Sequence, residues 1–413
     1  MKEKKGIIIT VVVAVIVLGV LSYALATRHK ANKPKTAGNR ETVKTTETAV
    51  SESAVSPAAV VTEETPAKDI YQDYFLVGAA INGSDIDTMA IKHKGMAKIL
   101  KENFNSTTLS NLMKPDYLLD EKATKKSKDG MPVCKFDTCD PALKFCQENG
   151  IKMRGHTLIW HNQTPSWLFY KNYDVKSGKL ADAKTMAKRM ESYIKQVITH
   201  CQKKYPGVVY AWDVVNEAVG DDGNYRTESM WYETYGDFSY IKDAFTFARK
   251  YAEEGTKLFL NDYNEYIAQK RDLLYAKVVE LYDAGLLDGV GMQSHWDMDF
   301  PSVDLFETAL EKYASIDGIE IQLTEIDMHN TDDSEEGLKK QAERYKEFFD
   351  VITKMKREGK ANITSVTFWG LKDGESWLSG FKGETSYPLL FTDDMEKKPC
   401  YDSILEAGKT AQK

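Results

Sequence analysis

The chain has 413 residues and a formal net charge of −7, with 42% hydrophobic and 11% aromatic residues. This length exceeds that of most single domains, so we expect a catalytic domain accompanied by shorter segments. The acidic balance gives no basic face for a phosphate backbone, which excludes nucleic acid as an expected partner. The five cysteines form no CxxC pair, so we predict no zinc or other metal site and no disulfide framework. A single bridge between Cys134 and Cys139 is left open.

The N-terminus departs from this composition. Gly6 to Ala26 is an uncharged run of 21 residues, a length that can span the core of a bilayer. Lysines precede the run, which is typical of a cytoplasmic start, and Ala24-Leu25-Ala26 resembles a signal-peptidase site. We therefore expect residues 1–30 to be an uncleaved signal anchor, or else a cleaved signal peptide. The rest of the chain is then extracytoplasmic, either membrane-anchored or secreted.

The next segment, residues 31–68, contains no aromatic residue and no Leu, Ile or Met. Its Thr, Ala, Glu, Ser and Pro residues cannot bury enough apolar surface to offset the entropy lost on ordering. We predict a disordered linker here. From residue 69 to residue 413 the composition is that of a globular protein, and we expect this part to be the catalytic domain.

Short apolar runs recur through the globular part, separated by longer stretches of helical period such as Ala183–Lys203, Tyr240–Glu254 and Glu335–Arg357. The eight runs are Phe75–Ile81, Phe104–Thr108, Ile151–Thr157, Val208–Val214, Lys257–Asn261, Gly289–Gln293, Ile319–Thr324 and Ser365–Trp369. Strands that alternate with helices pair in parallel. Eight such units predict an α/β fold of the (β/α)8 TIM-barrel type, whose active site lies at the carboxyl ends of the strands.

Two of the predicted strands lead into acidic residues. Asn216 and Glu217 follow the fourth run, and Glu325 follows the seventh. Because the carboxyl ends of barrel strands face one opening, we expect both carboxyl groups at one cleft. Glycoside hydrolysis needs such a pair, one group to protonate the leaving oxygen and one to attack or to activate water. A single acid after a strand is more often a helix cap or salt-bridge partner, so the prediction rests on the pair.

Other strand ends carry rings, amides and imidazoles, which bind neutral sugars by stacking and hydrogen bonding. For each histidine or tryptophan taken alone, a structural role in the core is the competing interpretation. The residues at or just after the end of a run are His156, Trp160 and Gln163 for the third run, Asn261 and Tyr263 for the fifth, Gln293 and His295 for the sixth, and Trp369 and Trp377 for the eighth.

Together these segments resemble a glycoside hydrolase family 10 endo-β-1,4-xylanase, from about Tyr71 to Tyr401. The resemblance rests on seven motifs that occur in order: FNSTTLSNLMKPD, RGHTLIWHNQTPSW, WDVVNEA, FLNDYN, DGVGMQSH, QLTEID and TFWGLKDGESW. It implies endo-acting hydrolysis of β-1,4-xylosidic bonds in xylan. The anomeric configuration would be retained through a covalent glycosyl-enzyme, and no cofactor would be needed.

The resemblance also implies a role for each matching residue. Glu217 is similar to the general acid/base and Glu325 to the nucleophile, with Asn261 and Asp327 as supporting residues. Ser110 stands where the family often has Glu, which puts the second donor-side subsite in doubt. The substrate-binding residues implied are Asn111, Lys114, His156, Trp160, Gln163, Asn216, Tyr263, Gln293, His295, Trp369 and Trp377.

Two alternatives stay open at this point. Another retaining β-1,4-glycanase, such as a cellulase or a mixed-linkage glucanase, would need room in the donor-side pocket for the hydroxymethyl group of glucose. A non-catalytic sugar-binding barrel would lack one of the two acids, whereas both are present. The expected partners are xylan and xylo-oligosaccharides, and the membrane only through an uncleaved N-terminal segment. We expect the protein to be a monomer.

Overall fold

The computed structural model describes residues 65–411. No helix in that range is long and apolar enough to cross a membrane. We correct the predicted membrane-anchored, extracytoplasmic location accordingly: the described chain offers no membrane span, and the run Gly6–Ala26 that suggested one lies outside it. The predicted linker, residues 31–68, also lies outside, apart from its end, where helix α2 (Ala67–Ile70) begins.

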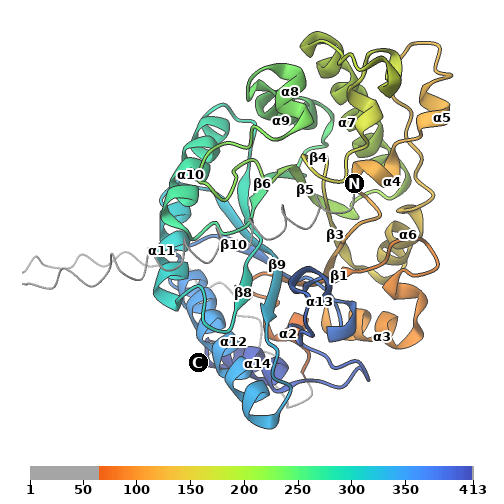
Figure 1. The fold of residues 1–413 in the computed structure, drawn as a ribbon. Helices are drawn as coiled ribbons and strands as arrows, with labels where there is room; N and C mark the ends of the chain where they lie inside the picture. The colour runs from red at the N-terminus through yellow and green to blue at the C-terminus, as the bar shows by residue number, and fades with distance from the viewer. Residues whose placement is uncertain (1–64, 412–413) are drawn as a thin grey trace, which may run out of the picture. The chain divides into compact units, whose positions relative to one another are not determined.

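The strands form a closed parallel barrel, which confirms the fold expected from the eight apolar runs (Figure 1). Strand β10 pairs in parallel with both β9 and β1 and so closes the ring. Two short strands, β4 (Ile159–Trp160) and β8 (His295–Asp297), pair with the carboxyl-terminal parts of β5 and β9. Within residues 65–411 the eight barrel strands are β1 (Leu76–Ile81), β2 (Ser106–Leu109), β3 (Lys152–Gly155), β5 (Val209–Asn216), β6 (Lys257–Asp262), β7 (Gly289–Met292), β9 (Glu320–His329) and β10 (Ile363–Phe368).

Helices follow the strands and lie around the outside of the barrel (Figure 1). The sequence located the long ones well, although α9 ends at Tyr251, short of the predicted Glu254, because Ala252 takes an extended conformation. The helices are α3 (Lys94–Asn103), α4 (Pro115–Leu118), α5 (Glu121–Thr124), α6 (Asp140–Asn149), α7 (Ala183–Lys204), α8 (Met230–Tyr235), α9 (Ser239–Tyr251), α10 (Ala268–Asp283), α11 (Val303–Ala314), α12 (Glu335–Arg357), α13 (Leu378–Lys382) and α14 (Pro399–Ala411).

Helix α7 illustrates why these segments become helical and where they pack. The side chain of Asp182 accepts the backbone N–H of Thr185 and caps the N-terminus. Buried Met186, Met190 and Ile194 recur every four residues, so one face of α7 packs on the core. The outer helices α9 and α10 also bury one face, although neither has a side-chain cap.

The cysteines are all free and play no part in cross-linking the barrel. Cys134 and Cys139, the one pair left open by the sequence, form no bridge. Burial raises the pKa of the Cys146, Cys201 and Cys400 thiols to about 12. Thiols with such pKa values stay protonated at neutral pH, so these side chains act as small apolar groups of the core.

Candidate active site

Glu217 lies directly after β5, where the barrel opens. Its carboxyl group accepts three hydrogen bonds: from the indole of Trp160 at 2.9 Å, from Gln293 at 3.1 Å and from Asn216 at 3.3 Å. The backbone of Glu217 has a φ of 57°, a left-handed conformation that is uncommon outside glycine. Strained backbone of this kind persists where surrounding bonds fix it, and it often marks functional positions.

The surroundings of Glu217 favour its protonated form. Burial raises the pKa of Glu217, and the negative charge of Asp262 raises it further. The hydrogen bonds from Trp160 and Gln293 favour the charged form and only partly oppose these effects. A carboxyl group with a raised pKa keeps its proton to a higher pH than an ordinary Glu and can donate it to a leaving group.

Glu325 lies within β9 rather than after it and is 4% exposed. Its Oε1 accepts the amide of Asn261 at 2.8 Å, and its Oε2 lies 3.5 Å from Nε2 of His295. His156 approaches Oε1 with its Nδ1 at 3.9 Å. Burial alone would raise the pKa of Glu325, but the charge of His156 and the hydrogen bond from His295 outweigh it and hold the pKa below its ordinary value. Glu325 therefore loses its proton at a lower pH than Glu217.

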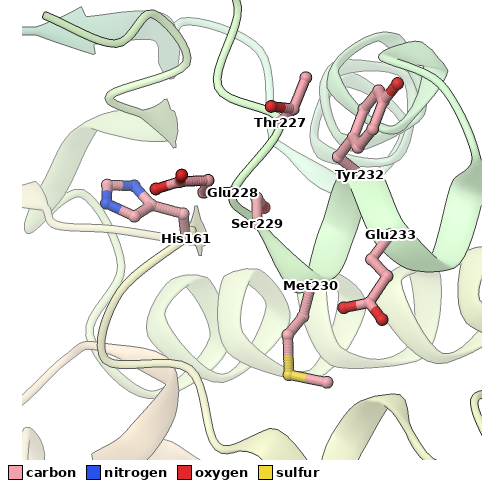
Figure 2. A pocket seen from close by; sticks show the side chains of 7 residues that line it. All are labelled: His161, Thr227, Glu228, Ser229, Met230, Tyr232 and Glu233. Atoms are coloured by element: carbon pink, nitrogen blue, oxygen red, sulfur yellow. The ribbon is translucent and has the colours of Figure 1, made fainter.

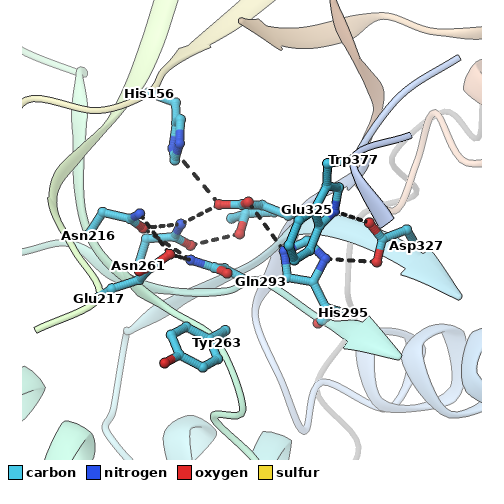
Figure 3. Close-up of polar contacts among 12 residues, drawn as sticks. His156, Asn216, Glu217, Asn261, Tyr263, Gln293, His295, Glu325, Asp327 and Trp377 are labelled. Atoms are coloured by element: carbon cyan, nitrogen blue, oxygen red, sulfur yellow. Dashed lines mark hydrogen bonds and ion pairs between the residues drawn. The ribbon is translucent and has the colours of Figure 1, made fainter. Parts of the chain in front are cut away.

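Asn261, near the end of β6, connects the two acids (Figure 3). Its amide nitrogen donates to Glu325 and to Oδ1 of Asn216, both at 2.8 Å. The hydroxyl of Thr324 donates to the Asn261 oxygen at 2.7 Å, which fixes the orientation of the amide. Gln293 also donates to Asn216, at 3.2 Å. Asn261 therefore links Glu325 to the side chain of Asn216, and its supporting role in catalysis stays a prediction.

His295, Asp327 and Trp377 form a second chain behind Glu325 (Figure 3). Asp327 accepts the indole N–H of Trp377 at 2.9 Å and lies 2.8 Å from Nδ1 of His295. Burial disfavours a charged imidazole, but Asp327 and Glu325 outweigh it and raise the pKa of His295 to about 10. A cationic His295 therefore faces the Glu325 carboxylate.

Asn111, Lys114 and Gln163 form a hydrogen-bonded cluster next to the ring of Trp160. The Lys114 ammonium donates to Gln163 at 2.7 Å, Gln163 donates to Asn111 at 3.2 Å, and the ammonium lies 4.5 Å from the Trp160 ring centroid. Burial lowers the pKa of Lys114 to about 8, although Glu325 and Glu217 favour its charged form. Ser110, the departure from the family pattern, is buried and donates to the carbonyl of Ile81 at 3.4 Å.

The two predicted cleft tryptophans differ in exposure. Trp369 is 8% exposed, and its ring meets the His156 ring edge to face at a centroid distance of 5.3 Å. Trp377 is 40% exposed and packs against His295 at 5.1 Å. Trp369 therefore forms part of the wall behind the imidazoles, whereas Trp377 offers an open ring surface.

Two charged residues of this site were not singled out from the sequence. Asp213, in β5, accepts two hydrogen bonds from Arg154 and lies 2.9 Å from Nδ1 of His156. Both Arg154 and Asp213 are buried inside the barrel. The available signal was a charged residue within each of two neighbouring apolar strands, since buried charges are almost always paired.

His161 belongs to the RGHTLIWHNQTPSW motif but was not assigned a role. It lies 3.9 Å from Oε2 of Glu217 and lines a hollow of about 400 Å³ together with Thr227, Glu228, Ser229, Met230, Tyr232 and Glu233 (Figure 2). Burial and the cations Arg226 and Lys270 lower the pKa of His161 to about 3. His161 is therefore a neutral neighbour of Glu217.

Comparisons with known proteins agree with this geometry. The family model for glycosyl hydrolase family 10 matches residues 67–407. The chain belongs to that family. Within residues 65–411, no group of three or more His, Cys, Asp or Glu side chains is arranged to hold a metal ion.

The relatives are xylanases. The chain is 49% identical to endo-1,4-beta-xylanase B of Butyrivibrio fibrisolvens over 345 residues, covering 83% of this chain but 53% of that protein. It is 34% identical to the beta-1,4-xylanase of Dictyoglomus thermophilum over 353 residues, covering 82% of this chain and 90% of that protein. The chain thus spans about half the length of the first relative and most of the second.

Solved structures give the same result. The CBM22-1–GH10 modules of a Clostridium thermocellum endo-1,4-beta-D-xylanase, complexed with xylohexaose, match with a TM-score of 0.75 at 36% identity, covering 83% of this chain and 68% of that chain. A mutant of an intracellular xylanase from Thermoanaerobacterium saccharolyticum, complexed with xylotetraose, matches with a TM-score of 0.72 at 34% identity, covering 84% and 100%.

Proposed function

We propose that this protein is an endo-acting xylanase that hydrolyses β-1,4-xylosidic bonds with retention of the anomeric configuration. The observation that carries the proposal is the pair of buried acids with opposite pKa shifts, Glu217 raised and Glu325 lowered. A retaining glycosidase needs one carboxyl group as a proton donor and one carboxylate as a nucleophile. The family and its xylan-degrading members support the choice of substrate.

In the first step, the Glu325 carboxylate attacks the anomeric carbon of the bound xylose. The bond from that carbon to the leaving oxygen breaks as Glu217 donates its proton to this oxygen. The products are a free sugar chain and a xylosyl ester of Glu325. Asn261, which donates to Glu325 at 2.8 Å, holds the attacking oxygens in place.

In the second step, esterification has removed the negative charge of Glu325, so the pKa of Glu217 falls and Glu217 is now a carboxylate. It takes a proton from a water molecule, and the resulting hydroxide attacks the anomeric carbon. The ester bond breaks and Glu325 returns as a carboxylate. Two inversions at one carbon give net retention.

We assign each proposed substrate contact according to where the residue lies relative to Glu217 and Glu325. Asn111, Lys114 and Gln163 form one hydrogen-bonded cluster with Trp160 beside it, which suits the hydroxyl groups of the donor sugars. His156, Asn216, Gln293, His295, Trp369 and Trp377 surround the bond to be cut, and Tyr263 lies across it. We further propose that residues 69–413 form the catalytic domain. The monomeric state stays a prediction.

Incubation of the purified protein with xylan, glucomannan and carboxymethyl cellulose tests the proposal. We expect release of xylo-oligosaccharides of intermediate length from xylan and little product from the other two polymers. Rapid release from carboxymethyl cellulose would favour the cellulase alternative. Release of xylose alone, without intermediate oligosaccharides, would contradict the endo-acting mode.

A further inference from the structure

A second charged network lies next to the turn that follows Glu217. Asp262, the last residue of β6, is fully buried. Its Oδ2 accepts the backbone N–H of Val219 at 3.1 Å, and its Oδ1 accepts that of Tyr263 at 3.0 Å. Asp262 therefore anchors the turn that follows Glu217 as well as the start of its own loop.

Lys270, near the start of α10, completes this network. Its ammonium lies 2.8 Å from Oδ1 of Asp262 and 3.3 Å from the ring centroid of Tyr263, and its side chain is 2% exposed. Removing both charges from water is costly, and the attraction between them regains about as much as the removal costs. Fold stability is therefore a weak reason for burying this pair beside the acids.

Further bonds fix the backbone of Glu217 from both sides. The N–H of Glu217 donates to the carbonyl of Asn261 at 2.8 Å. Arg226 donates to the carbonyl of Glu217 at 3.3 Å and to the hydroxyl of Tyr263 at 3.2 Å. The left-handed conformation of Glu217 is thus held between β6 and Arg226, with Asp262 holding the next turn.

We propose that the buried pair Asp262–Lys270 is a positioning unit for Glu217, which anchors the turn after this residue and presents a fixed negative charge to its carboxyl group. The inference rests on the proposed function, because it concerns the acid/base role of Glu217. Asp262 and Lys270 act through Glu217 and Tyr263 and take no part in bond making or breaking.

Lys270 acts on the pKa of Asp262, and Asp262 acts on the pKa of Glu217, so both partners are needed to affect Glu217. After burial, Asp262 is the largest contribution that raises the pKa of Glu217. Burial also raises the pKa of Asp262, and Lys270 gives the largest effect in the opposite direction. Lys270 thus favours the charged form of Asp262 against the effect of burial, and the negative charge of Asp262 in turn favours the protonated form of Glu217. The other charged or titratable groups that face Glu217 are Glu325 from β9, Arg226 and His161 from loops, Tyr263 after β6 and Lys114 before α4.

The pH dependence of kcat/KM tests the proposal, because a purely structural pair would leave it in place. In Asp262→Asn, the alkaline limb, which reports loss of the Glu217 proton, is expected to move down by roughly 1 unit, the lower end of the effect of a nearby charge. Lys270→Met should move the limb in the same direction, since it removes the largest effect that lowers the pKa of Asp262 and so weakens the negative charge near Glu217. The double variant should show no larger shift than Asp262→Asn alone, because the two residues act in series.

Leaving groups provide a second readout. An activated aryl leaving group needs little proton donation, whereas a sugar leaving group needs much. Both variants should therefore lose several-fold more activity on xylo-oligosaccharides than on an aryl β-xylobioside. Equal losses on both substrates, or an unmoved alkaline limb in folded variants, would overturn the proposal. Circular dichroism shows whether each variant folds. If Asp262→Asn does not fold, the alkaline limb and the substrate dependence of Lys270→Met test the proposal.

Glu265→Gln serves as the matched control. Glu265 is another fully buried acid after β6, its Oε1 accepts the hydroxyl of Ser294 at 3.3 Å, and burial raises its pKa to about 7. The alkaline limb should stay in place in this variant, and an equal shift would show that any buried acid has the same effect, against the proposal.

A wild-type protein that does not cut xylan would refute the proposed function itself. Active variants with an unmoved limb would refute only the role of the pair.

Discussion

Nδ1 of His295 lies 2.8 Å from Oδ1 of Asp327. The same carboxylate accepts the indole N–H of Trp377 at 2.9 Å, so one buried acid orients both an imidazole and an indole. This arrangement leaves Nε2 of His295 directed at Glu325, 3.5 Å away. Asp327 therefore positions one of the two imidazoles that lower the pKa of the proposed nucleophile.

Replacement of His295 by Asn should raise the pKa of Glu325, because a hydrogen bond and a positive charge that lower this pKa are lost. The acidic limb of kcat/KM then moves up by roughly 1 unit, as expected for one nearby charge. A pH profile on an aryl β-xylobioside measures it. His161→Asn is the control, because His161, with a pKa of about 3, is neutral over the working range and should leave the acidic limb in place. An unmoved limb in His295→Asn would contradict the assigned role.

The free energy of unfolding should also depend on the charge of His295, and this contribution should decrease as the pH rises. Its pKa in the folded protein is raised to about 10, whereas an unfolded histidine titrates near 6.5, about the ordinary value. The charged imidazole therefore contributes stability that is fully present below about pH 6.5 and is lost as the pH rises through the folded value. Urea unfolding of the wild type and of His295→Asn should show the largest difference at low pH within the stable range. A difference that grows with pH would contradict this.

Trp369→Ala should weaken the binding of xylo-oligosaccharides by roughly 1–3 kcal/mol, the range for losing a large ring at a contact. The ring packs against His156, so its loss also frees the imidazole beside Glu325. Isothermal titration with xylotetraose and cellotetraose measures affinity and preference. If the affinity and the preference for xylose over glucose both survive, Trp369 belongs to the core and not to the sugar-binding wall.

The thiols should be unreactive in the folded protein. Four of the five cysteines are buried, and burial raises the pKa of the remaining one, Cys134, to about 12. Ellman titration at neutral pH should detect almost no thiol before unfolding and all five afterwards. Fewer than five thiols after unfolding without reductant would indicate a disulfide.

Much of the fold follows from local patterns in the sequence. The barrel strands are apolar runs between amphipathic helices, which is the pattern expected of parallel strands that are buried on both faces. Glu217 and Glu325 were identified because polar residues at the ends of such strands must share one opening. Short strands such as β4 and β8 were missed, because two or three residues carry no periodicity.

The charged networks could not be predicted residue by residue. Asp213 and Arg154 are 59 positions apart, and Asp262 at the end of β6 meets Lys270 near the start of α10 across the loop between the two elements. Pairing of this kind depends on strand register and helix rotation, which the hydrophobic pattern does not determine. The sequence shows a charge inside an apolar strand but does not show which opposite charge compensates it.

The stereochemical outcome follows from the roles of Glu217 and Glu325. In the wild type, the first product detected by proton NMR should be the β-anomer, since a retaining enzyme inverts the anomeric carbon twice. We also expect the two carboxyl groups to lie roughly 5–5.5 Å apart, compared with the roughly 6.5–9.5 Å that leaves room for water in an inverting enzyme. An α-anomer that forms first would rule out retention.

Two variants then separate the roles of these acids. Glu325→Ala removes the attacking group, so substrates with good and with poor leaving groups should both stall. Azide can enter the space left by the carboxylate and attack from that face, which gives an α-glycosyl azide. Glu217→Ala removes only proton transfer, so an aryl β-xylobioside should still form the ester with Glu325. Azide then opens this ester from the other face and gives a β-glycosyl azide. Opposite anomers support the assignment, whereas exchanged anomers would reverse the roles of Glu217 and Glu325.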